Sequence, residues 1–258
     1  MKGIILAAGR GTRLSKYTRF RPKGMLKFNG MSLLEYQINT MRQIGIEDIV
    51  IVKGYMKDKI NFKDIEFYVN DNFEETNMVE SLFCAVDELE GECIITYSDI
   101  IYENHVLNQS VESKCDIGVV VDKDFENYWV ERLGNDYQKD LESLVIENGK
   151  ITSLGELEPD ESEICARYVG IIKLSEKGAK SLKDNYLKFK DSQATSKWEN
   201  RIFEKWHMTD LLQGMIDEGC IIEPITISRG WLEFDTDRDY ELYRAWLKNN
   251  HLENFIKL

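Results

Sequence analysis

Apolar and polar positions repeat with two different periods along the first hundred or so residues. Four short apolar runs predict buried strands of the kind found in parallel sheets. They lie at 2–9 (KGIILAAG), 48–55 (DIVIVKGY), 65–70 (IEFYVN) and 92–99 (ECIITYSD). Two stretches between them, 32–46 and 76–91, have the spacing of amphipathic helices. Strands that alternate with helices indicate βαβ units and a parallel sheet with helices on both faces.

The two predicted helices carry their own start and stop signals. Ser32 directly precedes the first apolar position and Glu35 follows three residues later, which is the pattern of a capping box. The second helix is expected to continue to Gly91, since glycine readily adopts the backbone conformation that closes a helix.

After residue 101 the pattern loosens, although it still predicts strands and helices. Strands are expected at 115–124, 166–175 and 220–228, a hairpin at 141–157 with its turn at Asn148-Gly149, and helices from Glu176 and over 207–219. A short strand and a helix capped by Thr236 or Asp237 complete the chain. We therefore expect an α/β protein, organised as a single domain over 1–258, with a Rossmann-like three-layer α/β/α fold and a mostly parallel, mixed central sheet.

Composition narrows the class of protein. Hydrophobic residues make up 43% and charged residues 31% of the 258 positions, as in globular proteins that are soluble. No apolar run is long enough for a membrane span, and the first residues lack the long apolar region of a signal peptide. The five cysteines form no CxxC pair, which favours reduced thiols over disulfides or a zinc site. We expect a cytoplasmic protein without a membrane partner.

The distribution of charge is uneven. The net charge is −13, yet residues 1–34 contain eight basic and no acidic side chains, so the remainder carries −21. An acidic surface repels nucleic acid, which excludes a polyanionic partner. A basic segment in that background favours a small anionic ligand, and charge alone leaves a solvated basic loop as the alternative.

The basic segment contains a spaced motif, G-x-G-T-R-L followed by P-K. It lacks the third glycine of the dinucleotide-binding fingerprint, because Leu14 stands there, and it lacks the pattern of a P-loop. Gly9 and Gly11 allow backbone amides to approach a phosphate closely. Arg13 and Lys23 add fixed positive charge that suits phosphate oxygens.

Carboxylates follow two predicted strands. Asp99 comes at the carboxyl end of a strand, where ligands bind in open α/β sheets, and could hold Mg²⁺ or serve as a helix cap. Glu233 and Asp235 alternate along a short strand, so both point to one face. Asp237 and Asp239 are interpreted as capping residues of the last helix.

These motifs resemble the signature of nucleotidyltransferases that make nucleotide sugars and related activated compounds. The resemblance rests on LAAGRGTRL…RPK and on WLEFDTDRDY. It implies that the first loop wraps a nucleoside triphosphate and that Arg13 and Lys23 contact its phosphates. It also implies that Asp99 and Asp235 bind the catalytic Mg²⁺, which makes these four residues the expected catalytic set.

The stretch TNMVESL replaces the glycine-rich sequence of sugar-nucleotide enzymes. It resembles cytidylyltransferases that act on phosphocholine, 2-aminoethylphosphonate or phosphoglutamine, enzymes that activate groups for cell-surface polysaccharides or phospholipid head groups. This implies CTP and a small phosphorylated or phosphonylated acceptor as partners. Residues 1–101 would bind the nucleotide, and 102–258 would bind the acceptor and complete the metal site. The further nucleotide contacts implied are Leu6, Ala7, Ala8, Gly9, Gly11, Thr12, Thr76, Asn77, Ser81, Tyr97 and Ser98.

The acceptor site is expected among the aromatic and charged residues of the second half. Trp129, Tyr168 and Trp231 could cage a quaternary ammonium by cation–π attraction, or belong to the core. Glu233 could pair with an amine, and Arg132 with a phosphonate, phosphate or carboxylate. Two alternatives stay open: a sugar-1-phosphate nucleotidyltransferase that uses UTP, dTTP or GTP, and a nucleotide-sensing module without catalysis. A homo-oligomer also stays open.

Overall fold

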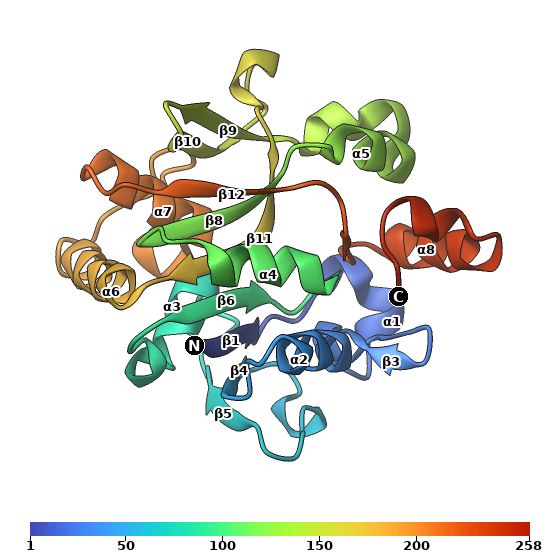
Figure 1. Ribbon diagram of the computed structural model, residues 1–258. Coiled ribbons are helices and arrows are strands. Elements are labelled where there is room, and N and C mark those ends of the chain that lie inside the picture. The colour runs from blue at the N-terminus through green and yellow to red at the C-terminus, as the bar shows by residue number, and fades with distance from the viewer.

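A seven-stranded mixed sheet forms the centre of the computed structural model, which describes the backbone of residues 1–258 and all side chains except those of 135, 136 and 161 (Figure 1). Across the sheet the strands follow the order β12-β8-β11-β6-β1-β4-β5. Their bounds are Glu223–Ile227, Ile117–Asp122, Arg167–Leu174, Cys93–Tyr97, Lys2–Ala7, Ile49–Lys53 and Glu66–Val69, in the same order. All neighbours are parallel except β11, which is antiparallel to both β6 and β8. The expected α/β class with a mostly parallel sheet is confirmed.

Helices cover both faces of the sheet because successive strand residues point in opposite directions. In β1, Ile4 enters one buried cluster and Ile5 the other. The Ile5 cluster is completed by α2 (Leu33–Gln43), α4 (Asn104–Glu112), α5 (Phe125–Leu133) and α8 (Asp237–Lys248). The Ile4 cluster is completed by α3 (Met78–Phe83), α6 (Glu176–Asp191) and α7 (Met208–Asp217). A short helix α1 (Ser15–Thr18) lies in the basic segment.

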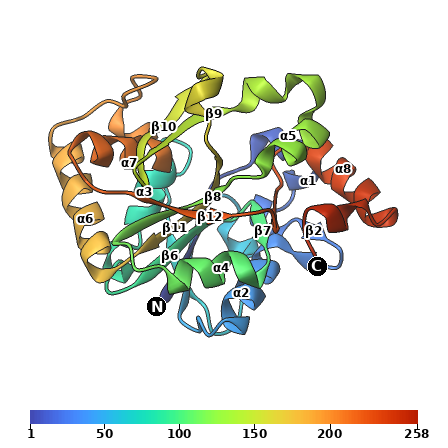
Figure 2. The same ribbon diagram turned by 45° about the horizontal axis from the view of Figure 1, so that its top comes forward.

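Local signals set several element boundaries as expected. Ser32 and Glu35 form the predicted capping box of α2. The hairpin joins β9 (Glu142–Glu147) to β10 (Lys150–Leu157), with Asn148 and Gly149 both at positive φ. Figure 2 shows this hairpin and α5 at the end of the molecule opposite α2. Among the described residues, no helix is both long and apolar enough to span a bilayer.

The helix predicted over 76–91 is shorter than expected. Helix α3 ends at Phe83, and a 3₁₀ turn follows at Val86–Glu88. The N–H of Cys84 is shared between the carbonyls of Glu80 and Ser81, so the hydrogen bonds tighten from i→i−4 to i→i−3 at this point. The α-helical register therefore stops well before Gly91.

A small sheet at the end of the chain positions the predicted carboxylates. Strand β13 (Trp231–Glu233) pairs antiparallel with β7 (Ile100–Tyr102). The N–H of Phe234 donates to the carbonyl of Asp99 over 2.8 Å, which holds the two segments together. Thr236 caps α8, one of the two predicted alternatives. A second small sheet pairs β2 (Lys27–Phe28) with β3 (Met31–Ser32).

Candidate active site

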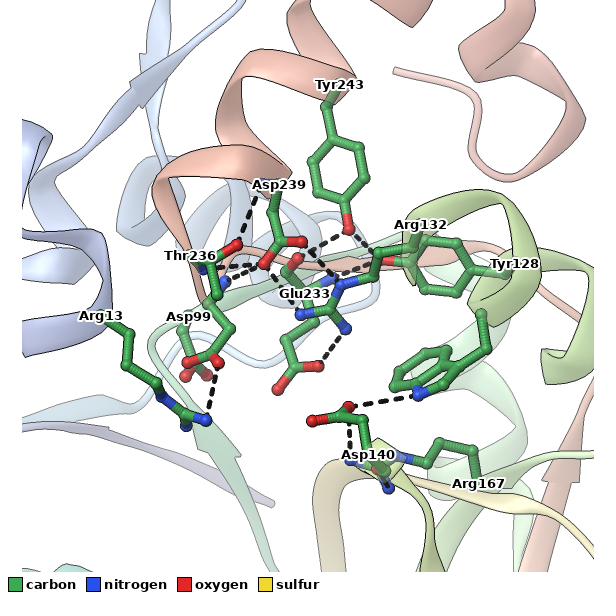
Figure 3. Close-up of polar contacts among 12 residues, drawn as sticks. Arg13, Asp99, Tyr128, Arg132, Asp140, Arg167, Glu233, Thr236, Asp239 and Tyr243 are labelled. Atoms are coloured by element: carbon green, nitrogen blue, oxygen red, sulfur yellow. Dashed lines mark hydrogen bonds and ion pairs between the residues drawn. The ribbon is translucent and has the colours of Figure 1, made fainter. Parts of the chain in front are cut away.

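Lys23 lies between two carboxylates that come from distant parts of the chain. Its Nζ is 2.9 Å from Oδ2 of Asp99 and 3.0 Å from Oδ1 of Asp235. Arg13 reaches the other oxygen of Asp235, with Nη1 3.1 Å from Oδ2. The structure thus brings together the four residues predicted as the catalytic set; Figure 3 shows Arg13 and Asp99 close to the end of β13. Their catalytic roles stay a prediction.

Burial and charge act against each other in this cluster. Burial lowers the pKa of Lys23, but the two carboxylates outweigh it and raise that pKa above its usual value. Burial raises the pKa of Asp235, only partly opposed by Lys23 and Arg13. Oδ1 of Asp99 is buried and has no hydrogen-bond partner among the described residues. A buried carboxylate oxygen without a hydrogen-bond donor is energetically unfavourable, and a cation bound to it would reduce that cost.

The glycine-containing loop passes directly over the lysine. Gly11 has a φ of 66°, and a Cβ built on it would lie 3.0 Å from Cβ and Cδ of Lys23. A side chain here would be strained by its backbone conformation and would press on the lysine stem. Gly11 therefore lets the first loop cover Lys23 while its Nζ stays between the carboxylates.

A cavity of about 370 Å³ opens beside this cluster, between the first loop and the start of α3. Every residue predicted to contact the nucleotide lines it except Ala7. Ala7 is 3% exposed and belongs to the buried cluster on the Ile5 face, because alternate residues of β1 point away from the cavity. The sequence did not single out three further lining residues, namely Phe73, Met78 and His207.

A second cavity of about 310 Å³ continues from the first. Arg13, Asp99 and Asp235 line both cavities. The Lys23 cluster, which consists of these three residues and Lys23, therefore lies where the two cavities meet. Three predicted acceptor residues, Tyr168, Trp231 and Glu233, are on the wall of the second cavity. The other two predicted acceptor residues, Trp129 in the aromatic cage and Arg132 as the partner of an anionic group, do not line this cavity.

Trp129 and Arg132 belong to the core rather than to a cavity wall. Trp129 is 0% exposed, and its ring lies 4.9 Å and 4.8 Å from the guanidinium carbons of Arg132 and Arg167. Trp231, at 2% exposure, donates from Nε1 to Asp122 over 2.9 Å. An aromatic face that already contacts the protein's own arginines cannot surround a ligand's ammonium group.

Arg132 is fully engaged by carboxylates. Its Nε and Nη2 each donate to Asp239 over 2.9 Å, and its Nη1 donates to Glu233 over 2.6 Å (Figure 3). The side chain is 2% exposed and each of its three nitrogens donates to a carboxylate, so in this structure Arg132 does not reach the cavity as its predicted contact with an acceptor requires. Burial raises the pKa of Glu233, but Arg132, Arg167 and Lys23 together outweigh burial and lower that pKa to about 2, so Glu233 stays ionised at the cavity wall.

Asp239 does more than cap a helix. The predicted capping role is confirmed, since Asp239 and Thr236 form a capping box at the start of α8. The same carboxylate also accepts from the backbone N–H of Asp235 over 3.0 Å and from Arg132. Asp239 thereby ties α5, α8 and the Asp235 loop together, a connection that helix patterns do not reveal.

The charged residues at the far end of the second cavity were missed by the sequence analysis. They are Lys139, Asp140, Glu142, Arg167 and Arg201. Nη1 of Arg167 donates to the carbonyl of Asp140 over 2.9 Å, while Nε of Arg167 is buried without a partner among the described residues (Figure 3). The only signal for Arg167 was its position next to Tyr168 at the start of a predicted strand.

Comparison with known proteins identifies the family. Residues 3–160 match the family model described as a MobA-like NTP transferase domain. The chain belongs to this family. It is 32% identical over 253 residues to a CTP:phosphoglutamine cytidylyltransferase of Campylobacter jejuni subsp. jejuni, covering 94% of this chain and 98% of that protein. The resemblance to nucleotidyltransferases that was drawn from the motifs is confirmed, and the chain is an enzyme of that type.

Two other proteins agree with this assignment. The chain is 32% identical over 159 residues to a choline-phosphate cytidylyltransferase of Streptococcus pneumoniae, covering 59% of this chain and 68% of that protein. The solved structure of the CTP:phosphocholine cytidylyltransferase from Streptococcus pneumoniae matches with a TM-score of 0.71 at 21% identity, covering 95% of this chain and 98% of that one. At that identity the structural match shows the fold alone.

Proposed function

We propose that this enzyme is a CTP-dependent cytidylyltransferase that transfers CMP to the phosphate or phosphonate of a small acceptor and releases pyrophosphate. The observation that carries the proposal is the Lys23 cluster at the junction of two cavities, one on each side of the reacting atoms. The printed names of the relatives support CTP and acceptors such as phosphoglutamine and choline phosphate.

In the proposed reaction, an anionic oxygen of the acceptor attacks the α-phosphorus of CTP in line. A P–O bond forms to the acceptor, the bond between the α-phosphorus and its bridging oxygen breaks, and pyrophosphate leaves with the electron pair. The attacking oxygen needs no general base, since it is already ionised. The chain therefore acts by positioning both substrates and by neutralising charge, with Lys23 at the α-phosphate and Arg13 at the departing pyrophosphate.

We propose Asp99 and Asp235 as ligands for Mg²⁺. The unpaired Oδ1 of Asp99 fits this role, and Mg²⁺ in proteins is commonly held by one or two carboxylates together with substrate phosphates. Among the described side chains, no group of three or more histidines, cysteines and carboxylates could hold a metal alone, which agrees with a site that the nucleotide completes. When bound, Mg²⁺ would stabilise charge on the transferring group.

We propose that the start of α3 recognises the cytidine. Nδ2 of Asn70 donates to the hydroxyls of Thr76 and Ser81 over 2.9 Å each, which fixes these two residues on the wall of the first cavity. Asn77 caps α3 with its side chain. The nucleotide half, 1–101, and the acceptor half, 102–258, would act as one domain, since β6 of the first half pairs directly with β11 of the second.

A pyrophosphate-release assay tests the nucleotide and the acceptor class. We expect turnover with CTP and Mg²⁺, and much slower turnover with UTP, dTTP or GTP, when the acceptors are phosphoglutamine, 2-aminoethylphosphonate and phosphocholine. Faster turnover with UTP, dTTP or GTP and a sugar 1-phosphate would support the sugar-nucleotide alternative instead. Binding of CTP without pyrophosphate release for any acceptor would favour the sensing module.

Amide variants test the assigned carboxylates. Asp99→Asn and Asp235→Asn should each lower kcat at least about 1000-fold, because each removes charge needed in the transition state. Asp237→Asn is the matched control, since Asp237 is two residues away and its Oδ1 accepts from the N–H of Lys16 outside both cavities. Near-normal kcat in Asp99→Asn would remove the basis of the mechanism.

A further inference from the structure

We infer that the acceptor carries an amino-acid head group, whose carboxylate is bound by Arg167 and whose ammonium group is bound by Glu142. The inference rests on the proposed function and assigns the substrate class that fits the far end of the second cavity.

The position of the reacting atoms determines which end of the acceptor meets Arg167. The acceptor's phosphate must reach the junction of the two cavities, where Asp99 and Asp235 lie. Arg167 and Glu142 line the second cavity and not the first. They therefore face the part of the acceptor that does not react, and they select its head group.

Arg167 has a buried donor without a partner, which suits a carboxylate. The protein shows the geometry in Arg132, whose Nε and Nη2 together hold the carboxylate of Asp239 at 2.9 Å each. In Arg167 the same two nitrogens are only partly used: Nε is buried and has no partner among the described residues, and Nη2 forms a long ion pair of 3.9 Å with Oδ2 of Asp140. A carboxylate placed there would accept two parallel hydrogen bonds.

Glu142 offers the opposite charge. Glu142 lines the cavity, and its carboxylate makes no hydrogen bond or ion pair with the described residues. Other charged groups on the wall are already engaged: Glu233 is paired with Arg132, and Arg201 with Asp210 over 2.9 Å. The unpaired carboxylate of Glu142 would bind the ammonium group of a zwitterion, and the partly paired guanidinium of Arg167 would bind its carboxylate.

The same features disfavour a quaternary ammonium head group. Trp129 is buried beneath two guanidinium groups, so it offers no aromatic face to a ligand. The hydroxyl of Tyr168 donates to that of Tyr97 over 3.2 Å. A cation alone would leave Nε of Arg167 without a hydrogen-bond partner and would be repelled by the positive charge of Arg167 inside the cavity.

The test compares phosphoglutamine with its analogue that lacks the α-carboxylate. We expect the wild-type KM for phosphoglutamine to be about 10- to 100-fold lower than that for the analogue, as a charged hydrogen-bonded pair allows. Arg167→Gln should remove this difference by raising the KM for phosphoglutamine, with the KM for the analogue nearly unchanged. Glu142→Gln should behave in the same way toward the analogue that lacks the α-amino group. Arg42→Gln, which removes an arginine on α2 outside both cavities, is the control.

Calorimetric titration of each acceptor, without CTP, separates this inference from the proposed function. Binding of phosphoglutamine that depends on Arg167, together with absence of CMP transfer, would support the inference and reject the proposed function. Equal use of both acceptors by the wild type, or faster use of phosphocholine, would reject the inference while CMP transfer stands. If Arg167→Gln does not fold, as judged by circular dichroism, the Glu142→Gln comparison decides.

Discussion

Replacing Lys23 by methionine removes the positive charge that lies between the carboxylates of Asp99 and Asp235 and leaves Arg13 on Asp235 alone. Since Nζ is 2.9 Å from Asp99 and 3.0 Å from Asp235, the two carboxylate oxygens can be no more than about 6 Å apart. With an effective dielectric constant of about 20, two negative charges at that distance repel by about 3 kcal/mol. The variant should lose about this much free energy of unfolding at pH 8 without metal, which corresponds to about 6–12 °C in Tm for a chain of this size.

The loss should depend on pH in a defined direction. The repulsion, added to burial, raises the folded-state pKa of one carboxylate above its unfolded value of about 4. The folded variant then binds more protons than the unfolded chain in the window above pH 4, so its stability rises as the pH falls through that raised pKa. The deficit relative to wild type should therefore shrink from pH 8 toward pH 4.

Urea unfolding and thermal denaturation measure the effect, with and without about 10 mM Mg²⁺. Mg²⁺ should raise the Tm of Lys23→Met more than that of the wild type, because the carboxylates then lack their internal cation. Lys27→Met, at an exposed lysine on β2, should change stability by less than about 0.5 kcal/mol. A variant as stable as the wild type at pH 8 without metal, or a deficit that is equal at pH 5 and pH 8, would show that Lys23 does not screen repulsion between the two carboxylates.

Three further substitutions test the surroundings of the site by urea unfolding. Arg132→Met should lower the free energy of unfolding by about 3–5 kcal/mol, because it leaves Asp239 charged and buried without its partner. A loss under about 1 kcal/mol would contradict a stabilising role of the ion pair. Trp129→Ala should lower stability by about 3–5 kcal/mol, as for a core aromatic residue, and a neutral result would show that the ring is not packed. Gly11→Ala should lower stability by about 1–2 kcal/mol and also reduce kcat, and unchanged values of both would show that the loop relaxes freely.

Local rules explain why much of the fold could be predicted from the sequence. The capping box at Ser32 and Glu35 involves residues three positions apart, and the turn at Asn148-Gly149 needs only two residues that tolerate positive φ. Such signals do not depend on distant parts of the chain. The helix predicted to reach Gly91 failed because the sequence pattern does not distinguish an α-helix from a 3₁₀ turn that continues the same apolar face.

The second cavity is shaped by long-range contacts, and the sequence predicted only part of its lining, namely Tyr168, Trp231 and Glu233. Arg132 and Trp129 have chemistry suited to ligands, but their partners Asp239 and Arg167 come from other elements. Arg167 was missed because its role depends on β11 running opposite to β8, which places residue 167 beside Asp122. The Lys23 cluster was predicted through motif resemblance, not through any spacing rule that links its distant members.

Strand β11 runs against the rest of the sheet, so its first residues, rather than its last, reach the edge where the parallel strands end. The residues proposed to bind the acceptor therefore lie at the start of β11 and in the β9–β10 hairpin. These segments are separate from those that contain Lys23, Asp99 and Asp235. After gene duplication, substitutions at Arg167 or Glu142 would redirect CMP to a different recipient while the inherited transfer chemistry stays intact. This arrangement makes new acceptor specificities accessible in few mutational steps.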